Sequence, residues 1–114
     1  MEEFDIAIIG GGPAGIMAAI AASADLNMVL LEKNSSLGSK LLITGGGRCN
    51  ITNEKPIKKL LNSFHDKNFL KHSFYTFTNE MLLDLFRNRG LDFIVEDNNR
   101  VFPETEKSQD ILAI

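Results

Sequence analysis

The stretch Phe4-Asp5-Ile6-Ala7-Ile8-Ile9-Gly10-Gly11-Gly12-Pro13-Ala14-Gly15 decides the fold of this 114-residue chain. Residues 4–9 form an apolar run that ends abruptly at three glycines, which is typical of a buried strand in a parallel sheet. Pro13 suits the first position of a helix, and the alanine-rich residues 14–24 predict about three helical turns. A second apolar run, residues 28–31, is closed by Glu32. The order strand, glycine-rich turn, helix and strand predicts a βαβ unit around a parallel sheet.

The glycines of the turn follow the pattern G-x-G-x-x-G. Between a strand and a helix, this pattern is the fingerprint of a dinucleotide-binding site. We expect Gly10 to allow the tight turn, Gly12 to let a pyrophosphate approach the backbone, and Gly15 to let the helix pack closely on the strand. The start of the helix, at Pro13 and Ala14, would offer positive partial charge to the phosphates. The alternative is a plain βαβ turn with surplus glycine, which the full context disfavours.

Glu32 stands at the end of the second strand, about 20 residues after the first glycine, where dinucleotide-binding folds place an acidic residue. Its carboxylate could accept hydrogen bonds from an adenosine ribose. Its negative charge would repel the 2′-phosphate of NADP. FAD or NAD therefore fits this site better than NADP.

A second glycine-rich motif follows, and it consists of Thr44, Gly45, Gly46, Gly47, Arg48, Cys49 and Asn50. Three consecutive glycines predict irregular backbone that is pressed against a flat or anionic ligand. Arg48 can hold a phosphate or a carboxylate by two parallel hydrogen bonds, and the Asn50 amide can contact a polar heterocycle. On composition alone, a flexible surface loop with incidental polar residues explains the motif equally well.

Cys49 is the single cysteine of the chain. It excludes an intrachain disulfide framework and a cysteine-rich zinc site, and it fits a reducing, cytoplasmic setting. Cys49 is either a redox thiol near a cofactor or a small buried residue. We favour the buried role because the chain has no second cysteine for a dithiol relay. His65 and His72 have no acidic or cysteine partner at metal-ligand spacing, so no metal site is predicted.

The remaining chain predicts helices and one hairpin. The helices are expected at residues 56–63, 67–77, 80–89 and from 108 onward, and the hairpin strands at 92–96 and 100–102. Residues 40–44 fit a short helix or a strand. In the helix at 80–89, capped by Thr78 or Asn79, we expect Leu82, Leu85 and Phe86 to face inward. The other phenylalanines at near-helical spacing, which we also assign to the core, are Phe64, Phe69, Phe74 and Phe77.

Composition narrows the class of protein. Hydrophobic residues make up 44% and charged residues 24%, which is ordinary for a globular domain. The net charge of −3 gives no basic footprint for nucleic acid. The longest apolar stretch, residues 16–22, is far shorter than the ~20 residues of a membrane span. The acidic start of the chain does not resemble a signal peptide. We expect neither nucleic acid nor a membrane as a partner.

Three strings make the chain similar to the YhiN/BaiN-type flavoproteins, which are NAD(P)/FAD-dependent oxidoreductases. The strings are Gly-Gly-Gly-Arg-Cys-Asn-Ile-Thr-Asn at residues 45–53, Phe-Tyr-Thr-Phe-Thr-Asn-Glu at 74–80, and Asn-Arg-Val-Phe-Pro at 99–103. The resemblance covers about residues 5–114. The family commonly has glycine where this chain has Asn99, a residue type that still tolerates positive φ.

The resemblance implies an FAD-binding domain of the glutathione-reductase type, in an enzyme that moves hydride between a nicotinamide cofactor and an unidentified small-molecule substrate. By this likeness the ADP half of FAD is held by Gly10, Gly12, Gly15 and Glu32, with Lys33 beside it. Lys40 and the loop at residues 44–50 would approach the pyrophosphate, ribityl chain or flavin ring. NAD(P)H would be the reductant. The alternatives are a non-enzymatic dinucleotide-binding sensor or interaction subunit, and an inactive truncated fragment.

The resemblance also implies a longer protein. Flavoproteins of this type are several times longer and return to the cofactor through a Gly-Asp segment, which this chain lacks. We therefore expect residues 1–114 to be the N-terminal part of a FAD/NAD(P)-binding domain. The expected fold is α/β, a Rossmann-like three-layer unit with an incomplete parallel sheet plus a helical and β-hairpin extension. The open strand edges of such a sheet predict self-association of the isolated chain.

Overall fold

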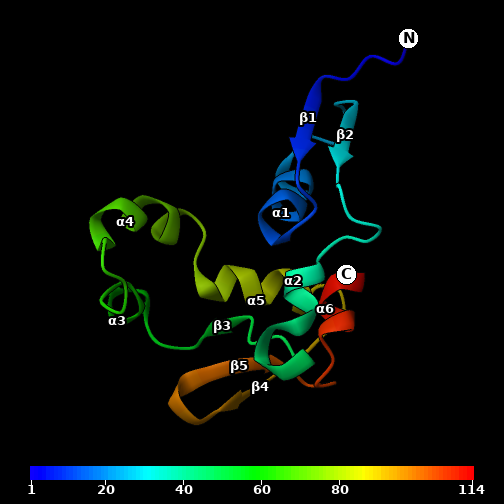
Figure 1. The fold of residues 1–114 in the computed structure, drawn as a ribbon. Helices are drawn as coiled ribbons and strands as arrows, with labels where there is room; N and C mark the ends of the chain where they lie inside the picture. The colour runs from blue at the N-terminus through cyan, green and yellow to red at the C-terminus, as the bar shows by residue number, and fades with distance from the viewer. The chain divides into compact units, whose positions relative to one another are not determined.

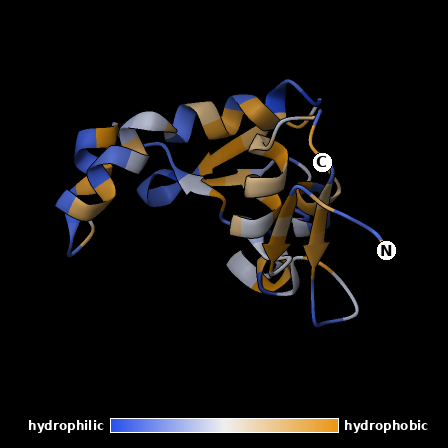
Figure 2. Cartoon of the chain, turned by 90° about the horizontal axis from the view of Figure 1, so that it is seen from above, coloured by the Kyte–Doolittle hydropathy of each residue, from blue (hydrophilic) through white to orange (hydrophobic).

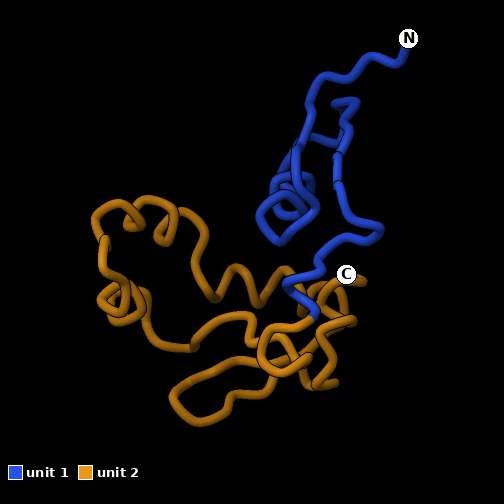
Figure 3. The backbone as a smooth tube through the Cα atoms, in the orientation of Figure 1, with its two compact units in different colours: residues 1–42 blue, residues 43–114 orange.

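The computed structural model describes residues 1–114, and they divide into two compact units, residues 1–42 and 43–114 (Figure 3). Unit 1 contains β1 (Ile6–Ile9), α1 (Pro13–Ala21) and β2 (Met28–Leu31) (Figure 1). β1 and β2 pair in parallel, with Ile6 opposite Met28 and Ile9 opposite Leu31. The predicted βαβ unit and the α/β class are confirmed.

Helix α1 is shorter than predicted. It ends at Ala21, whereas the alanine-rich stretch runs to Ala24. Ser23 stops it, because its carbonyl oxygen accepts from Leu26 N–H (3.1 Å) and its hydroxyl oxygen accepts from Asp25 N–H (3.4 Å). Serine side chains compete with helical hydrogen bonding in this way and favour turns.

The apolar side chains of unit 1 are incompletely covered within this chain. Figure 2 shows β1 and β2 in the hydrophobic colour, yet Ile9 is 86% exposed and Leu31 is 52% exposed. No residue of α1 is fully buried. Parallel sheets are normally covered on both faces, so these strands present apolar surface on which further structure can pack.

The chain then forms a mixture of short helices and strands. These are α2 (Ser39–Ile43), the 3₁₀ helix η1 (Thr44–Gly47), β3 (Thr52–Asn53), α3 (Ile57–Leu61), α4 (Lys67–Thr76), α5 (Asn79–Arg87), β4 (Phe93–Glu96), the 3₁₀ turn η2 (Asp97–Asn99), β5 (Arg100–Pro103) and α6 (Ser108–Ala113). The undecided residues 40–44 are therefore mostly helical. No helix in the structure is both long enough and apolar enough to cross a membrane.

An antiparallel sheet organises unit 2, with strand order β3-β5-β4. The β4–β5 hairpin is confirmed, with Val95 opposite Val101 and Glu96 opposite Arg100. β3 was not predicted. It pairs Thr52 with Val101 and makes β5 the central strand, so the β5 residues Val101 and Phe102 are 0% and 1% exposed.

The core of unit 2 lies between this sheet and α5. Leu83 is 2% exposed and Phe86 is 7% exposed, and the Phe86 ring meets the Phe93 ring edge to face at 5.9 Å. Phe86 was predicted to face inward, but the most buried leucine of α5 is Leu83, and Leu82 and Leu85 are only partly buried. Thr78 is the helix cap, because its hydroxyl accepts from Met81 N–H at 3.2 Å.

The phenylalanines of the α3–α4 region are largely outside the core. Phe69 is 79% exposed, Phe64 is 42% exposed and Phe77 is 40% exposed, so assigning them to the core was wrong. Phe64 and Phe74 pack edge to face at 5.3 Å on each other. Only Phe69 and Phe74 lie on α4, so near-helical spacing in the sequence did not place the four rings on one buried helix face.

Candidate functional site

A cleft of about 340 Å³ lies in unit 1 at the carboxyl ends of β1 and β2. It is lined by Ile9, Gly10, Gly11, Gly12, Pro13, Leu31, Glu32, Lys33, Asn34, Gly38, Ser39 and Lys40. Ligands of parallel α/β sheets gather at this edge. The predicted site residues Gly10, Gly12, Pro13, Glu32, Lys33 and Lys40 are thus brought together, and Ala14 and Gly15 follow in the first turn of α1.

The three fingerprint glycines, Gly10, Gly12 and Gly15, differ in their backbone angles and in the atoms around them. A Cβ built on Gly15 would overlap the carbonyl oxygen of Gly10, so this glycine is needed for α1 to pack against the end of β1. Gly10 has φ +102°, which side chains rarely adopt. Gly12 has an ordinary φ of −81°, and a Cβ there would meet nothing within 4 Å. Nothing in the chain itself therefore requires glycine at position 12, which borders the open cleft.

The carboxylate of Glu32 lies directly against the glycine turn. Its Oε2 accepts from Gly11 N–H at 2.7 Å, and its Oε1 accepts from the backbone and side-chain amides of Asn34 at 2.8 and 2.6 Å. The hydrogen bonds from Asn34 and then from Gly11 lower the pKa of Glu32 below its ordinary value of 4.5. A carboxylate offers about four acceptor positions, so three bonds leave capacity for a ligand hydroxyl.

Six residues of the cleft lining were not predicted as site residues: Ile9, Gly11, Leu31, Asn34, Gly38 and Ser39. Two of them shape the site. Asn34 orients Glu32, and Gly38 N–H donates to Gly11 O at 2.8 Å, which ties the loop after β2 to the glycine turn. Gly38 has φ +66° and is buried. An isolated glycine in a polar loop was a signal for such a backbone, whereas nothing in the sequence marks Asn34.

The charges and dipoles of the cleft suit an anion with hydroxyl groups. Gly12 is the N-cap of α1 and makes no side-chain capping bond, and the first turn of α1 holds no acidic residue. The first N–H groups of a helix have no partner within the helix, and the helix dipole is positive there. Lys33 and Lys40 line the cleft as well, while Glu32 supplies the acceptor for hydroxyl groups.

The second glycine motif, residues 44–50, lies in unit 2, and we call it the glycine loop. Thr44 begins η1, within which Gly45 (φ 57°, ψ 29°) and Gly46 (φ 68°, ψ 33°) have left-handed backbone. Gly47 follows at φ 86°. A Cβ on Gly45 would lie 2.8 Å from Asn50 N and 2.9 Å from Phe102 Cε1, so the loop packs tightly here. The predicted irregular backbone is present.

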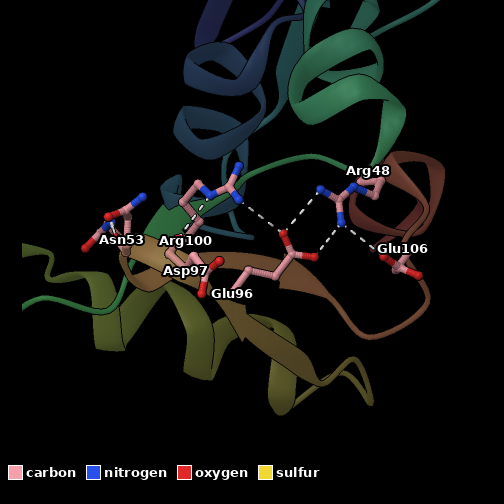
Figure 4. A network of polar contacts seen from close by, with 7 residues as sticks. Arg48, Asn53, Glu96, Asp97, Arg100 and Glu106 are labelled. Carbon is pink, nitrogen blue, oxygen red and sulfur yellow. Dashed lines mark hydrogen bonds and ion pairs between the residues drawn. The ribbon is translucent and has the colours of Figure 1, made fainter.

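Arg48 is surrounded by groups of unit 2 (Figure 4). Its Nη1 lies 2.6 Å from Glu96 Oε1 and 3.0 Å from Glu106 Oε1, and its Nη2 lies 3.3 Å from Glu96 Oε2. The hydrogen bonds that Arg48 donates to Glu96 and then to Glu106 raise the pKa of Arg48, and the same contact with Arg48 lowers the pKa of Glu96. The bidentate chemistry expected of Arg48 is thus directed at carboxylates of the chain itself.

The last two residues of the glycine loop differ, because Cys49 is buried and Asn50 is exposed. Cys49 is 4% exposed, and burial raises the pKa of its thiol, an effect that a hydrogen bond with Thr44 partly offsets. These features agree with the buried role rather than a reactive thiol. The Asn50 side-chain amide can donate to the carbonyl oxygens of Thr52 at 3.0 Å and Val101 at 3.3 Å. It therefore joins the loop to β3 and β5.

A second cavity, of about 360 Å³, lies within unit 2 and was not predicted. It is lined by Ile51, Thr52, Leu60, Ser73, Phe74, Phe77, Thr78, Asn79 and Leu82. Asn79 is buried beside it, and its amide donates to the carbonyl oxygens of Asn53 at 2.7 Å and Lys55 at 3.0 Å. The lining is mainly apolar, and it carries no charged side chain.

Comparison with known proteins identifies similar sequences. The chain is 34% identical over 112 residues to the 3-dehydro-bile acid delta(4,6)-reductase of Clostridium scindens and 33% identical over 112 residues to the ribosomal RNA dihydrouridine synthase of Escherichia coli. Each alignment covers 96% of this chain and 27% of the relative, so the chain spans about a quarter of the length of these relatives. The mitochondrial dihydrolipoyl dehydrogenase of Caenorhabditis elegans is 39% identical over 74 residues, which are 64% of this chain and 13% of that protein.

The family match agrees with the fold and with the glycine motifs. Residues 4–114 match the family described as the HI0933-like protein Rossmann domain. The two relatives aligned over 112 residues confirm the resemblance to YhiN/BaiN-type proteins. The βαβ unit with its cleft and the glycine loop both fall inside the matched residues. The chain therefore belongs to the HI0933-like family and carries its Rossmann domain.

Proposed function

We propose that the chain is the FAD-binding portion of a flavin-dependent oxidoreductase, in which hydride passes from NAD(P)H through the flavin to a small-molecule substrate. The observation that carries the proposal is the open space at Gly12, beside a cleft at the carboxyl ends of parallel strands. Packing explains Gly15 and backbone geometry explains Gly10, but neither explains glycine at position 12, which borders the cleft. A pyrophosphate is the group that approaches backbone at such a turn.

The cleft residues fit the ADP half of FAD. The unpaired N–H groups at the start of α1 would donate to the pyrophosphate, and Lys33 and Lys40 would neutralise part of its charge. Glu32, ionised and oriented by Asn34, would accept hydrogen bonds from the adenosine ribose. The same negative charge disfavours a 2′-phosphate, so NADP is a poor ligand for this cleft.

We assign the glycine loop to the flavin side of the cofactor. Its left-handed backbone at Gly45, Gly46 and Gly47 has no side chains that would keep a flat ring or a ribityl chain at a distance. FAD, when bound, supplies the hydride chemistry, while the protein binds, orients and shields it. Thr44, Arg48, Cys49 and Asn50 would contribute by shaping this loop and its approach to the cofactor.

The names of the relatives support an oxidoreductase and leave the substrate open. One relative is named for reducing a bile acid and another for making dihydrouridine in ribosomal RNA. Since two relatives at similar identity differ this much in substrate, family membership does not choose between such molecules. We propose a small-molecule substrate because the net charge of −3 gives this chain no overall electrostatic attraction for a nucleic acid.

The enzyme proposal is tested by the absorption spectrum of the freshly purified, undenatured protein. A yellow chromophore that is bleached by NADH and restored by an electron acceptor is the expected result. A colourless protein that takes up NAD instead would favour the dinucleotide-binding sensor.

Replacing Glu32 by alanine is expected to weaken ADP binding by roughly ten- to a hundredfold, the usual worth of hydrogen bonds to a charged group. The wild-type interaction should be complete at neutral pH and fade only in acid, as the pH falls through the lowered pKa of Glu32. Isothermal calorimetry with ADP measures both effects. Asp25→Ala, an exposed carboxylate of the same unit outside the cleft, is the control. Unchanged affinity in Glu32→Ala would remove Glu32 from the site.

ADP and FAD are expected to bind residues 1–114 with affinities within about tenfold of each other, because the cleft contacts the ADP half. Calorimetric titration with each ligand measures this ratio.

The exposed Ile9 and Leu31 predict that the chain self-associates, which sedimentation at several concentrations would show. A stable monomer that binds FAD far more tightly than ADP would contradict both expectations and would mean that this chain alone holds the flavin.

A further inference from the structure

The contacts of Arg48 leave little of its guanidinium available to a ligand. Two of its nitrogens are engaged with the carboxylates of Glu96 and Glu106. Its guanidinium carbon, Cζ, lies over the Phe102 ring, 4.0 Å from the ring centroid. Both ways in which arginine recognises an anion or an aromatic ring are therefore already used inside unit 2.

The charges around Arg48 balance. Arg100 also contacts Glu96, at 3.5 Å, so the network contains two guanidiniums, Arg48 and Arg100, and two carboxylates, Glu96 and Glu106 (Figure 4). Its formal net charge is zero. A site built to capture a phosphate carries surplus positive charge, and this network has none.

The same ring that Arg48 covers also supports the start of the glycine loop. A Cβ on Gly45 would lie 2.9 Å from Phe102 Cε1, so the backbone of Gly45 rests on this ring. Phe102 is 1% exposed, which makes it a fixed surface. The loop is thus held at both ends, by the ring at Gly45 and by the carboxylates at Arg48.

Between these two ends the backbone has positive φ angles, a conformation that is unusual for most residues. Gly45, Gly46 and Gly47 have positive φ, and Cys49 has φ 62°, which costs free energy for a residue with a Cβ. Within the loop, Cys49 N–H donates to Thr44 O at 3.0 Å, while the bond from Arg48 N–H to Gly45 O is long at 3.4 Å. The Arg48 side chain adds three hydrogen bonds to carboxylates, and these tie the loop to Glu96 and Glu106.

We infer that Arg48 is a positioning residue: through Glu96, Glu106 and Phe102 it holds residues 45–47 in the left-handed conformation in which they meet the ligand, and it does not itself bind the ligand's phosphates. The identity of that ligand rests on the proposed function. The inference about the loop does not, because the contacts that support it lie within unit 2.

The reactivity of the Cys49 thiol reports on the conformation of the glycine loop and can be measured without a cofactor. It is the single thiol of the chain, it adjoins Arg48, and it is 4% exposed. We expect Arg48→Lys and Glu96→Gln each to accelerate the reaction of Cys49 with Ellman's reagent at least tenfold. Neither variant keeps the forked pair of charged groups between Arg48 and Glu96, and lysine cannot form that pair and stack on Phe102 together. The matched control is Arg87→Lys, since Arg87 pairs with Glu80 at 3.6 Å and Asp84 at 3.1 Å on the surface of α5. Its rate should stay within about twofold of wild type.

Circular dichroism melts distinguish loosening of the loop from unfolding of the protein. The rates are compared at a temperature at which every variant is folded. If Glu96→Gln does not fold, Glu106→Gln takes its place with a smaller expected acceleration, because it removes the charge at a single 3.0 Å contact to a more exposed carboxylate. Wild-type thiol rates in folded Arg48→Lys would overturn the inference.

A double substitution separates positioning from direct ligand contact. In the Glu96→Gln background, Arg48→Lys should add less than threefold to the thiol rate and to the loss of FAD affinity, because both changes break one network. FAD affinity should fall to that of ADP in each single variant, while ADP affinity stays the same. If Glu96→Gln leaves FAD binding intact and Arg48→Lys alone weakens it, Arg48 contacts the cofactor and the inference is wrong. If wild-type protein binds no FAD, the proposed function fails, and the thiol rates alone decide the role of Arg48.

Discussion

Replacing Phe102 by alanine is expected to unfold residues 43–114 or bring them close to unfolding. Phe102 is 1% exposed, and it lies on the central strand of the antiparallel sheet. Truncating a buried phenylalanine to alanine costs about 3–5 kcal/mol, and whole domains are stable by only about 5–15 kcal/mol. The loss should be large because the ring also supports Arg48 and Gly45. Urea denaturation followed by far-ultraviolet circular dichroism measures the free energy of unfolding.

Phe69→Ala is the matched control for this prediction. It is the same substitution in the same unit, but Phe69 is 79% exposed. Its free energy of unfolding should change by no more than about 0.5 kcal/mol, as for other surface changes. Equal effects of the two substitutions would mean that Phe102 is not at the centre of the core.

Alanine at Gly15 and alanine at Gly12 are expected to act in different ways, although the chemical change is the same. At Gly15 the new Cβ would overlap the carbonyl oxygen of Gly10, so α1 must move away from β1. We expect a loss of about 1–3 kcal/mol in the free energy of unfolding, as for other overpacked sites, and loss of ADP binding. At Gly12 the new Cβ meets nothing in the chain, so Gly12→Ala should fold as wild type does.

Gly12→Ala should nevertheless weaken ADP binding about a hundredfold, because its methyl group would stand where we propose that the pyrophosphate approaches the backbone. Calorimetry with ADP and thermal melts of both variants provide the comparison. Full ADP affinity in a folded Gly12→Ala variant would show that no phosphate approaches this turn. A stable Gly15→Ala variant would show instead that α1 can shift at little cost.

The sequence predicted best those elements whose structure depends on residues close together in the chain. β2 was predicted at the residues where it occurs, and β1 and the β4–β5 hairpin within one or two residues at each end, because apolar runs, turn residues and glycines act locally. Gly10, Gly12, Pro13 and Glu32 of the cleft also followed from the glycine spacing, since the fingerprint itself encodes a strand, a turn and a helix. Lys33 and Lys40 were instead implied by the family resemblance. The two-residue strand β3 was missed, because so short a segment is defined by its partner, β5, and not by its own pattern.

The sequence by itself determined the βαβ unit, the α/β class, the family and the positions of the two glycine motifs. Only the tertiary structure decided what several of the side chains do. Arg48 pairs with Glu96 and Glu106, which are 48 and 58 residues away in the chain, and no local pattern marks them as partners. Phe69 and Phe102 are the same residue type, yet Phe69 is exposed and Phe102 is buried. The physical reason is that burial and ion pairing depend on which segments meet in space, whereas helices, strands and turns depend largely on residues close together in the chain.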